Sequence, residues 1–266
     1  MIRDITIGQY YPANSVIHRL DPRIKLLGTI VFIVSVFFIN DLTGLLLATI
    51  ALGGVIRLST IPVKYMLKGL RAIFVLLLFT IALNLFLTPG EVLVQIAFIK
   101  LTREGFVMAG QMAVRLVYLI VGSTIMTLTT TPNNLTDGLE KALSPLNKVH
   151  FPVHELAMTM SIALRFIPIL TEETDKIMKA QQARCTDFDE GNLAKRITSL
   201  IPVLVPLFIS AVRRANDLAM AMEARCYRGG TGRTKMKPLV YTKTDYMAYL
   251  IMLIYIMIWV AVKIWL

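Results

Sequence analysis

The sequence predicts an all-α membrane protein with about five transmembrane helices and a cytoplasmic helical module. Hydrophobic residues make up 56% of its 266 residues and charged residues only 17%, whereas soluble domains average about 45–50% and about 25%. A water-soluble globule cannot bury such an apolar excess, and a disordered chain is poor in apolar residues. The apolar residues also fall into separate blocks, and most of the 28 Lys and Arg residues lie between those blocks.

Four apolar blocks define an N-terminal membrane domain over residues 1–130. A spanning helix needs about 20 mostly apolar residues, and the blocks reach this length alone or with their flanks. The predicted spans are 24–40, 42–57, 70–88 and 106–130. An alternative for the first two is a re-entrant pair. Residues 1–20 lack the apolar core of a cleaved signal peptide, so we expect the first span to anchor the mature protein.

Two further segments complete the membrane part of the chain. Residues 91–103 are rich in β-branched residues and partly alternate, which predicts an external hairpin or a short interfacial element. Residues 244–266 form the last apolar block and predict a C-terminal transmembrane helix.

The basic residues predict the orientation of a multi-pass protein in the cell membrane. Of the 28 Lys and Arg residues, 24 precede the apolar stretch 26–39, lie between the apolar stretches 42–56 and 72–87, or lie within 131–243. The positive-inside rule therefore predicts a cytoplasmic N-terminus and an external C-terminus. Arg115 falls inside the fourth span, which makes it a candidate functional charge. It has two alternative structural partners, Glu104 or helix carbonyls near the external end.

Residues 131–243 predict a cytoplasmic module of amphipathic helices. A short helix follows Thr131-Pro132 and ends at Pro145; longer helices are expected over about 154–182 and from 193 or 201 to 227. We expect the internal prolines 168, 202 and 206 to kink or start these helices. Their apolar faces must pack on the membrane, on one another or on partner proteins.

The module contains an internal repeat. Residues 180–185 (AQQARC) match residues 221–226 (AMEARC) at an offset of 41, and each copy ends a charged helix. A basic residue at a helix C-terminus is favoured by about 0.3–1 kcal/mol, which explains one Arg as a simple cap. Lys would serve equally, so the repeated Ala-Arg pair favours two similar docking sites for a planar guanidinium.

In combination, these motifs resemble the EcfT family, the transmembrane scaffold subunits of energy-coupling factor (ECF) transporters. The resemblance covers essentially the whole chain and is carried by short motifs. They are LDPRIKLL at 20–27, Thr131-Pro132 with Leu135 and Leu139, ALRFIP at 163–168, the two Ala-Arg pairs, and RCYRG at 225–229.

The resemblance implies a function in prokaryotic uptake of vitamins or, in dedicated members, of nickel, cobalt or biotin. Such a scaffold holds a small substrate-binding membrane (S) subunit against two ABC-type ATPases. In the family, an Ala-Arg-Gly triplet ends each coupling helix, and its Arg enters a groove on one ATPase. Carried over, the docking residues are Ala183, Arg184 and Cys185 for one ATPase and Ala224, Arg225 and Cys226 for the other. Cys replaces Gly in both copies, and Cys adopts a positive φ poorly.

No catalytic motif is found. The chain lacks a phosphate-binding Gly-x-x-x-x-Gly-Lys-Ser/Thr loop, so we expect no ATP hydrolysis by this subunit and no cofactor. His150 and His154 lack a third metal ligand, and the two Cys are expected to be small side chains tolerated at helix ends. The basic face is attributed to topology and anionic lipid rather than nucleic acid. The Met residues of the module (Met158, Met160, Met178, Met220, Met222) are expected to face the core or a partner.

Two alternatives of other classes remain. A self-contained secondary transporter would need polar residues at mid-membrane, ideally on paired broken helices. The spans offer little beyond Asn84 and Arg115. A membrane-embedded enzyme would need clustered His or acidic residues near a membrane face, and the sequence shows no such cluster.

Overall fold

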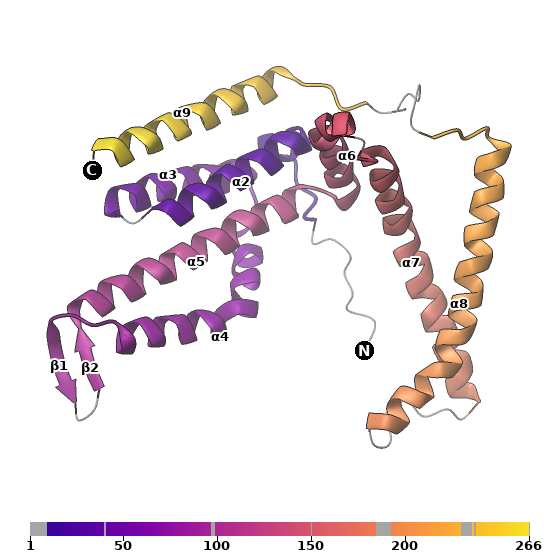
Figure 1. Cartoon of the computed structure of the whole chain (residues 1–266), viewed down its shortest axis with the longest axis horizontal. Coiled ribbons are helices and arrows are strands. Elements are labelled where there is room, and N and C mark those ends of the chain that lie inside the picture. The colour runs from indigo at the N-terminus through magenta and orange to yellow at the C-terminus, as the bar shows by residue number, and fades with distance from the viewer. Residues whose placement is uncertain are drawn as a thin grey trace. The chain divides into compact units, whose positions relative to one another are not determined.

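The computed structural model describes residues 10–39, 41–96, 99–149, 151–184, 193–229, 236 and 238–265. The chain is helical, as predicted, and forms two compact units (Figure 1). One unit runs through the described residues to Gly138 and resumes at Leu239; the other covers the residues between.

The first unit contains the predicted membrane helices. Its elements are α1 (Val16–Arg19), α2 (Pro22–Phe38), α3 (Leu42–Ser59), α4 (Val63–Leu87), α5 (Arg103–Thr129), the start of α6 (Pro132–Leu143), and α9 (Lys243–Trp265). Local sequence explains where several begin. The Asp21 side chain accepts a hydrogen bond from the Arg23 backbone N–H, and Pro22 occupies the first turn of α2, where its missing N–H costs nothing.

Helix α4 differs from the predicted span 70–88 because it begins at Val63. Its first part, Val63–Arg71, is bent by 65° from its second part, Ile73–Leu87. The apolar block found in the sequence corresponds to the second part. The first part carries charges at intervals and was therefore missed as helix.

A two-stranded antiparallel hairpin joins α4 to α5, which confirms the predicted hairpin within 91–103. Strand β1 (Val92–Ile96) pairs with β2 (Ile99–Thr102), and Ile96 lies opposite Ile99. The Glu91 backbone N–H donates to the Glu104 carboxylate at 2.8 Å, which fixes the start of the hairpin to the first turn of α5.

Helix α5 is the centre of this unit, packing against α2, α3 and α4. Its inward residues join α3 and α4 in one core cluster (Leu52, Ile61, Met66, Val121, Ile125, Leu128). A smaller cluster of Val36, Ile39 and Ala48 joins α2 to α3. Most other large apolar side chains of these helices are exposed, as expected for surfaces that face lipid.

Several helices are long and apolar enough to cross a membrane. Five pass this test: α3, α5, α7 (Val153–Ala183), Thr198–Ala224 of α8 (Leu193–Ala224), and α9; the two parts of α4 pass together as a sixth. Helix α2, at 17 residues, is marginally shorter. The sequence assigns α7 and α8 to the cytoplasmic module. Length and apolarity do not distinguish a span from an apolar helix that a partner covers.

Candidate functional site

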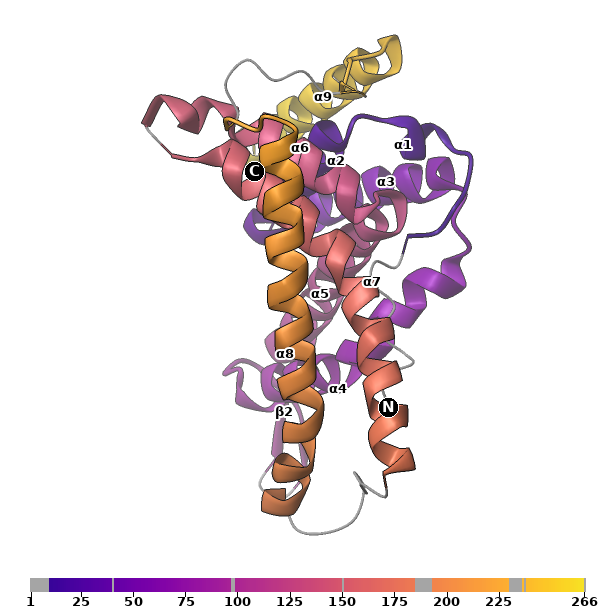
Figure 2. The same cartoon turned by 90° about the vertical axis from the view of Figure 1, so that its right-hand side faces the viewer.

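The predicted docking residues lie on α7 and α8, which form an antiparallel pair (Figures 1 and 2). Near the end of α7, the Gln181 amide donates to the Pro202 carbonyl at 3.2 Å. Further back, the Glu173 carboxylate accepts from Ser210 at 2.5 Å and from Arg214 at 2.6 and 3.1 Å. The contacts move up α8 as they move down α7, so the two helices run in opposite directions.

This arrangement places the two Ala-Arg pairs at opposite ends of the helix pair. Ala183 ends α7 and Ala224 ends α8. The end of α7 lies beside the start of α8, near Pro202, and α8 then runs on to Ala224. At about 1.5 Å per residue, the two arginines are separated by roughly 30 Å. One compact pocket cannot hold both, so the prediction becomes one of two separate docking points: the first at the end of α7 (Arg184) and the second at the end of α8 (Arg225).

The second docking point is built by a Schellman motif. The Cys226 N–H donates to the Glu223 carbonyl at 2.8 Å, and the Tyr227 N–H donates to the Met222 carbonyl at 3.0 Å. Cys226 itself has φ +54°, the left-handed conformation that this motif requires and that normally favours Gly. Cys226 therefore occupies the backbone state of the glycine that the family pattern places there.

The first docking point repeats the cap geometry at the same offset of 41. The Arg184 N–H donates to the Gln181 carbonyl at 3.0 Å, as the Arg225 N–H does to the Met222 carbonyl at 3.2 Å. Cys185 lies outside the described residues. The sequence repeat is thus a repeat of local structure over the residues that can be compared.

Both arginines are available to a partner. Ala183, Arg184, Ala224, Arg225 and Cys226 are all exposed. Within the described ranges, neither guanidinium has an ion pair or a side-chain hydrogen bond. A planar guanidinium with five donors suits a groove lined with carboxylates or carbonyls, and a neighbouring alanine allows close approach.

The helix pair also exposes a broad apolar surface. On α8 the exposed side chains are Leu200, Ile201, Leu204, Val205, Phe208, Ile209 and Val212. Met160 and Met220 are exposed, whereas Met158, Met178 and Met222 are half-buried, so a role for these residues at a partner surface stays a prediction. Contiguous apolar surface of this kind is typical of an interface with protein or lipid.

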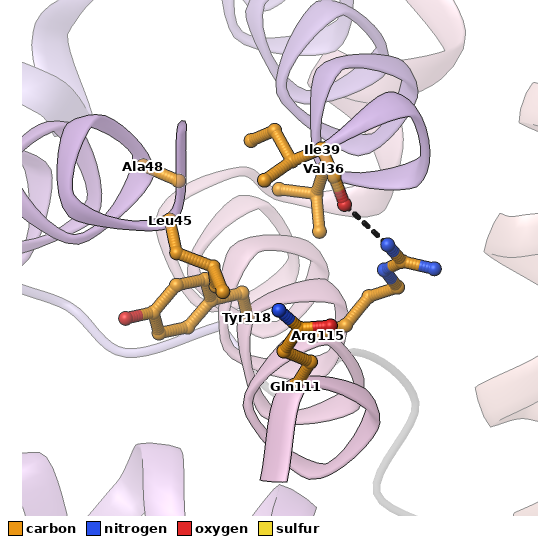
Figure 3. A pocket seen from close by; sticks show the side chains of 7 residues that line it. All are labelled: Val36, Ile39, Leu45, Ala48, Gln111, Arg115 and Tyr118. Atoms are coloured by element: carbon orange, nitrogen blue, oxygen red, sulfur yellow. Dashed lines mark hydrogen bonds between the residues drawn. The ribbon is translucent and has the colours of Figure 1, made fainter. Parts of the chain in front are cut away.

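Arg115 contacts the end of another helix (Figure 3). Its guanidinium donates to the carbonyl of Ile39, the residue that caps α2. The helix-carbonyl alternative is therefore the one observed, whereas Glu104 accepts from Glu91. Val36, Leu45, Ala48, Gln111 and Tyr118 line the small pocket around this contact. A cation at a helix C-terminus is stabilising, so this contact holds α5 to the end of α2, while a functional role for Arg115 stays a prediction.

His154 lies beside an acidic side chain, Glu140. Its Nδ1 lies 2.9 Å from the Glu140 carboxylate, and His150 lies outside the described residues. In the described part of the chain, no three His, Cys, Asp or Glu side chains lie close enough to hold a metal ion.

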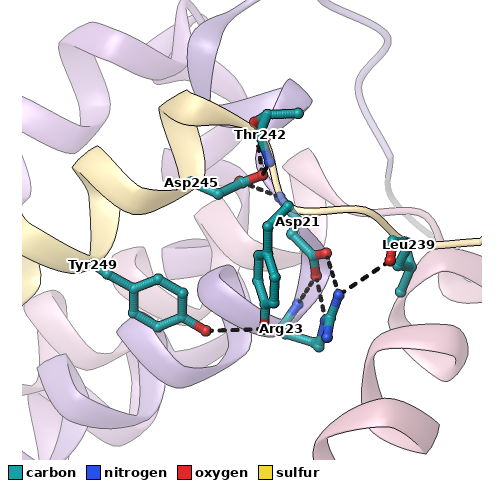
Figure 4. A network of polar contacts seen from close by, with 7 residues as sticks. Asp21, Arg23, Leu239, Thr242, Asp245 and Tyr249 are labelled. Atoms are coloured by element: carbon teal, nitrogen blue, oxygen red, sulfur yellow. Dashed lines mark hydrogen bonds and ion pairs between the residues drawn. The ribbon is translucent and has the colours of Figure 1, made fainter.

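A polar cluster around two buried aspartates joins the start of α2 to the start of α9, and the sequence did not reveal it (Figure 4). We call it the junction cluster: Asp21, Arg23, Tyr241, Thr242 and Asp245. The Asp245 carboxylate is 1% exposed and accepts from the Asp21 N–H at 2.9 Å and from the Thr242 N–H and hydroxyl at 2.7 Å.

Arg23 completes the junction cluster. Its guanidinium donates to the Asp21 carboxylate at 2.9 and 3.0 Å and lies over the Tyr241 ring, 4.1 Å from its centroid. The signals available were an Asp-Pro-Arg turn before one apolar helix and a lone Asp at the start of another. Nothing in their spacing predicts that they meet.

Comparison with known proteins gives these features a family context. A family model described as "CbiQ: Cobalt transport protein" matches residues 13–236. The chain is 51% identical to a Clostridium kluyveri protein, covering 100% of this chain and 99% of the relative. It is 54% identical to a Thermosediminibacter oceani protein (94% of each chain). It is also 48% identical to a Bacillus subtilis protein (92% and 93%). All three relatives are named energy-coupling factor transporter transmembrane protein EcfT.

Proposed function

Because the chain belongs to the CbiQ and EcfT family of transporter membrane proteins, we propose that it is the scaffold subunit of an energy-coupling factor importer. It is a multi-pass membrane component of a transporter. In the proposed role it links two cytoplasmic ABC-type ATPases to a small substrate-binding membrane subunit. The ATPases hydrolyse ATP, and this chain transmits their motion without catalysis of its own.

The observation that carries this proposal is the pair of matching helix ends on α7 and α8. Each presents an exposed Ala-Arg pair, and the two lie at opposite ends of one antiparallel helix pair. A single partner groove would need one arginine. Two equivalent arginines roughly 30 Å apart suit two equivalent partners, such as the two ATPases of one transporter.

The exposed apolar surface of α7 and α8 supports contact with the substrate-binding subunit. A face that met only water would be expected to carry charged or polar residues instead of a contiguous apolar patch. Exposed Met160 and Met220 add flexible side chains that can repack against a surface that moves during transport.

The proposed substrates are vitamins or related micronutrients. This follows from the resemblance to scaffold subunits that serve vitamin-binding partners. The alternative of a dedicated metal-ion scaffold is favoured by one observation, the family model's description as a cobalt transport protein. Uptake assays with the separate substrate-binding subunits of the host distinguish the two.

Charge reversal at the docking points tests the ATPase contacts. We expect Arg184→Glu together with Arg225→Glu to abolish co-purification of both ATPases, because each glutamate would repel the carboxylates or carbonyls expected to line the groove. Each single variant should weaken the contact at one end only. The measurement is the amount of each ATPase that co-purifies in mild detergent.

Arg213→Glu provides the matched control, since Arg213 is an exposed arginine within α8 away from its end. We expect this variant to retain both ATPases. Retention of both by the double variant, with its helical content intact, would overturn the docking proposal. Substrate uptake by the purified chain alone would instead favour a self-contained transporter.

A further inference from the structure

We infer that the turn at the start of α2 and the junction cluster anchor both ends of the coupling module, the unit between Leu139 and Pro238, to α2. These residues would then position the module so that its movement reaches the membrane helices. This inference rests on the proposed function. The chain leaves the membrane unit after Gly138 and returns at Leu239. Both residues contact the Asp21–Arg23 turn, although about 100 residues separate them along the chain.

Where the chain leaves the membrane unit, Gly138 packs tightly against Pro22 in the turn that begins α2. A Cβ added to Gly138 would lie 2.8 Å from the Pro22 Cβ and 3.3 Å from the Pro22 carbonyl carbon. Real Cβ atoms essentially never approach another atom so closely. Helix α6 therefore meets the start of α2 at a point where only glycine fits.

The returning chain is held by hydrogen bonds at the same turn. The Arg23 guanidinium donates to the Leu239 carbonyl at 3.4 Å, and Asp245 accepts from the Asp21 backbone. Hydrogen bonds that involve a charged group are the stronger kind, and buried ones are costly to break. The outgoing and the returning chain are therefore both held at this one turn, and we expect a displacement at either point to reach α2 and α9 together.

The test measures uptake per ATP hydrolysed in the reconstituted complex. Asp245→Asn and Arg23→Gln each weaken the returning side, and Gly138→Ala disturbs the outgoing side alone. We expect ATPase association and ATP hydrolysis to persist while uptake per ATP falls severalfold, because the module would then move without displacing α2 and α9 together. Asp41→Asn is the control, because Asp41 precedes α3 as Asp21 precedes α2 but makes no capping hydrogen bond.

The outcomes separate this inference from the proposed function. If the wild-type chain assembles with no ATPase, both fail. If it assembles and all three variants keep the wild-type uptake per ATP, only the anchoring role fails. A loss of uptake in strict proportion to assembled complex would show a purely structural role and would also overturn it.

An independent observation concerns the first part of α4. We propose that Val63–Arg71 lies in the membrane interface and binds anionic lipid headgroups. The segment has three distinct sides. Met66 is 2% exposed and Gly69 approaches Thr124 of α5, so this side faces protein. Lys64, Lys68 and Arg71 recur at intervals of four and three, which places them on one opposite face.

The third side is apolar and exposed. Val63 and Leu67 are 57% and 55% exposed, and they lie between the protein-facing side and the basic face. An apolar side adjoining a basic one matches the boundary between acyl chains and anionic headgroups. The 65° bend after Arg71 allows this part to follow the surface while Ile73–Leu87 crosses the membrane.

The test compares the protein in nanodiscs of phosphatidylglycerol and of phosphatidylcholine. We expect phosphatidylglycerol to raise the thermal stability of wild type and to remain bound after detergent extraction. K64Q/K68Q/R71Q should lose both effects, and a control with Lys176, Lys179 and Arg213 replaced by Gln should keep them. Two results would overturn the proposal. One is that K64Q/K68Q/R71Q still prefers phosphatidylglycerol to phosphatidylcholine. The other is that this variant keeps its bound lipid but loses a bound acidic protein.

Discussion

At the residue scale, Cys226 holds a backbone conformation that its side chain opposes. Its φ of +54° is stabilised by the two Schellman hydrogen bonds at the end of α8. Left-handed conformations are unfavourable for residues with a Cβ. We expect Cys226→Gly to raise the free energy of unfolding by about 0.5–1 kcal/mol, measured by thermal unfolding of the purified protein. Cys226→Ala keeps the Cβ and should bring no gain; equal stabilisation by both variants would contradict this account.

His18 provides a second prediction at this scale, concerning pH. Its Nε2–H donates to the Tyr11 carbonyl at 3.0 Å, and its Nδ1 lies 2.7 Å from the Ser15 hydroxyl. Burial lowers the pKa of His18 below its ordinary 6.5, the Tyr11 hydrogen bond opposes this effect, and the nearby Lys25 lowers the pKa further. The folded protein thus keeps His18 neutral at a pH where the unfolded chain protonates it.

The stability contribution of His18 is therefore complete above pH 6.5 and is lost as the pH falls below this value. We expect thermal unfolding of wild type to shift to lower temperature between pH 7.5 and pH 5.5 by more than that of His18→Gln. An identical shift in the two proteins would show that His18 does not titrate differently on folding.

At the element scale, an ion pair and a hydrogen bond join the middle of α7 to α8. Glu173 accepts from both Ser210 and Arg214, and the Arg214 side chain is 41% exposed. We expect Arg214→Gln to lower the thermal unfolding temperature slightly, because solvent-exposed ion pairs contribute little to stability. The effect should diminish at high salt, because screening weakens it. Arg213→Gln, at the neighbouring exposed position, should change neither the stability nor its salt dependence. Equal effects of the two variants would argue against a contribution from the Glu173–Arg214 ion pair.

The elements that sequence reasoning identified correctly are those with a local signal. Apolar blocks and start residues gave the helices, and the offset of 41 revealed matching helix ends on α7 and α8. The first part of α4 was missed because its charges interrupt the apolar block. The junction cluster was missed because Asp21 and Asp245 are 224 positions apart. Periodicity shows which face of a helix is buried but not which distant segment covers it.

At the scale of the whole molecule, the last prediction concerns the side of the membrane on which α7 and α8 end. The sequence predicts a cytoplasmic module from its 16 Lys and Arg residues between 131 and 243. The same region supplies two helices that are long and apolar enough to span. A cytoplasmic module and a membrane-spanning helix pair place the two cysteines of the chain differently, because α7 and α8 are antiparallel.

If α7 and α8 both crossed the bilayer, their C-terminal ends would lie on opposite sides, and so would Cys185 and Cys226. In a cytoplasmic module both cysteines lie inside. We expect a membrane-impermeant thiol reagent to label Cys185→Ser and Cys226→Ser equally in inside-out vesicles and to label neither in right-side-out cells. A double variant without cysteine is the control for background. If one single variant is labelled from outside, the helix pair crosses the membrane, and the docking point beside the labelled cysteine cannot contact a cytoplasmic ATPase.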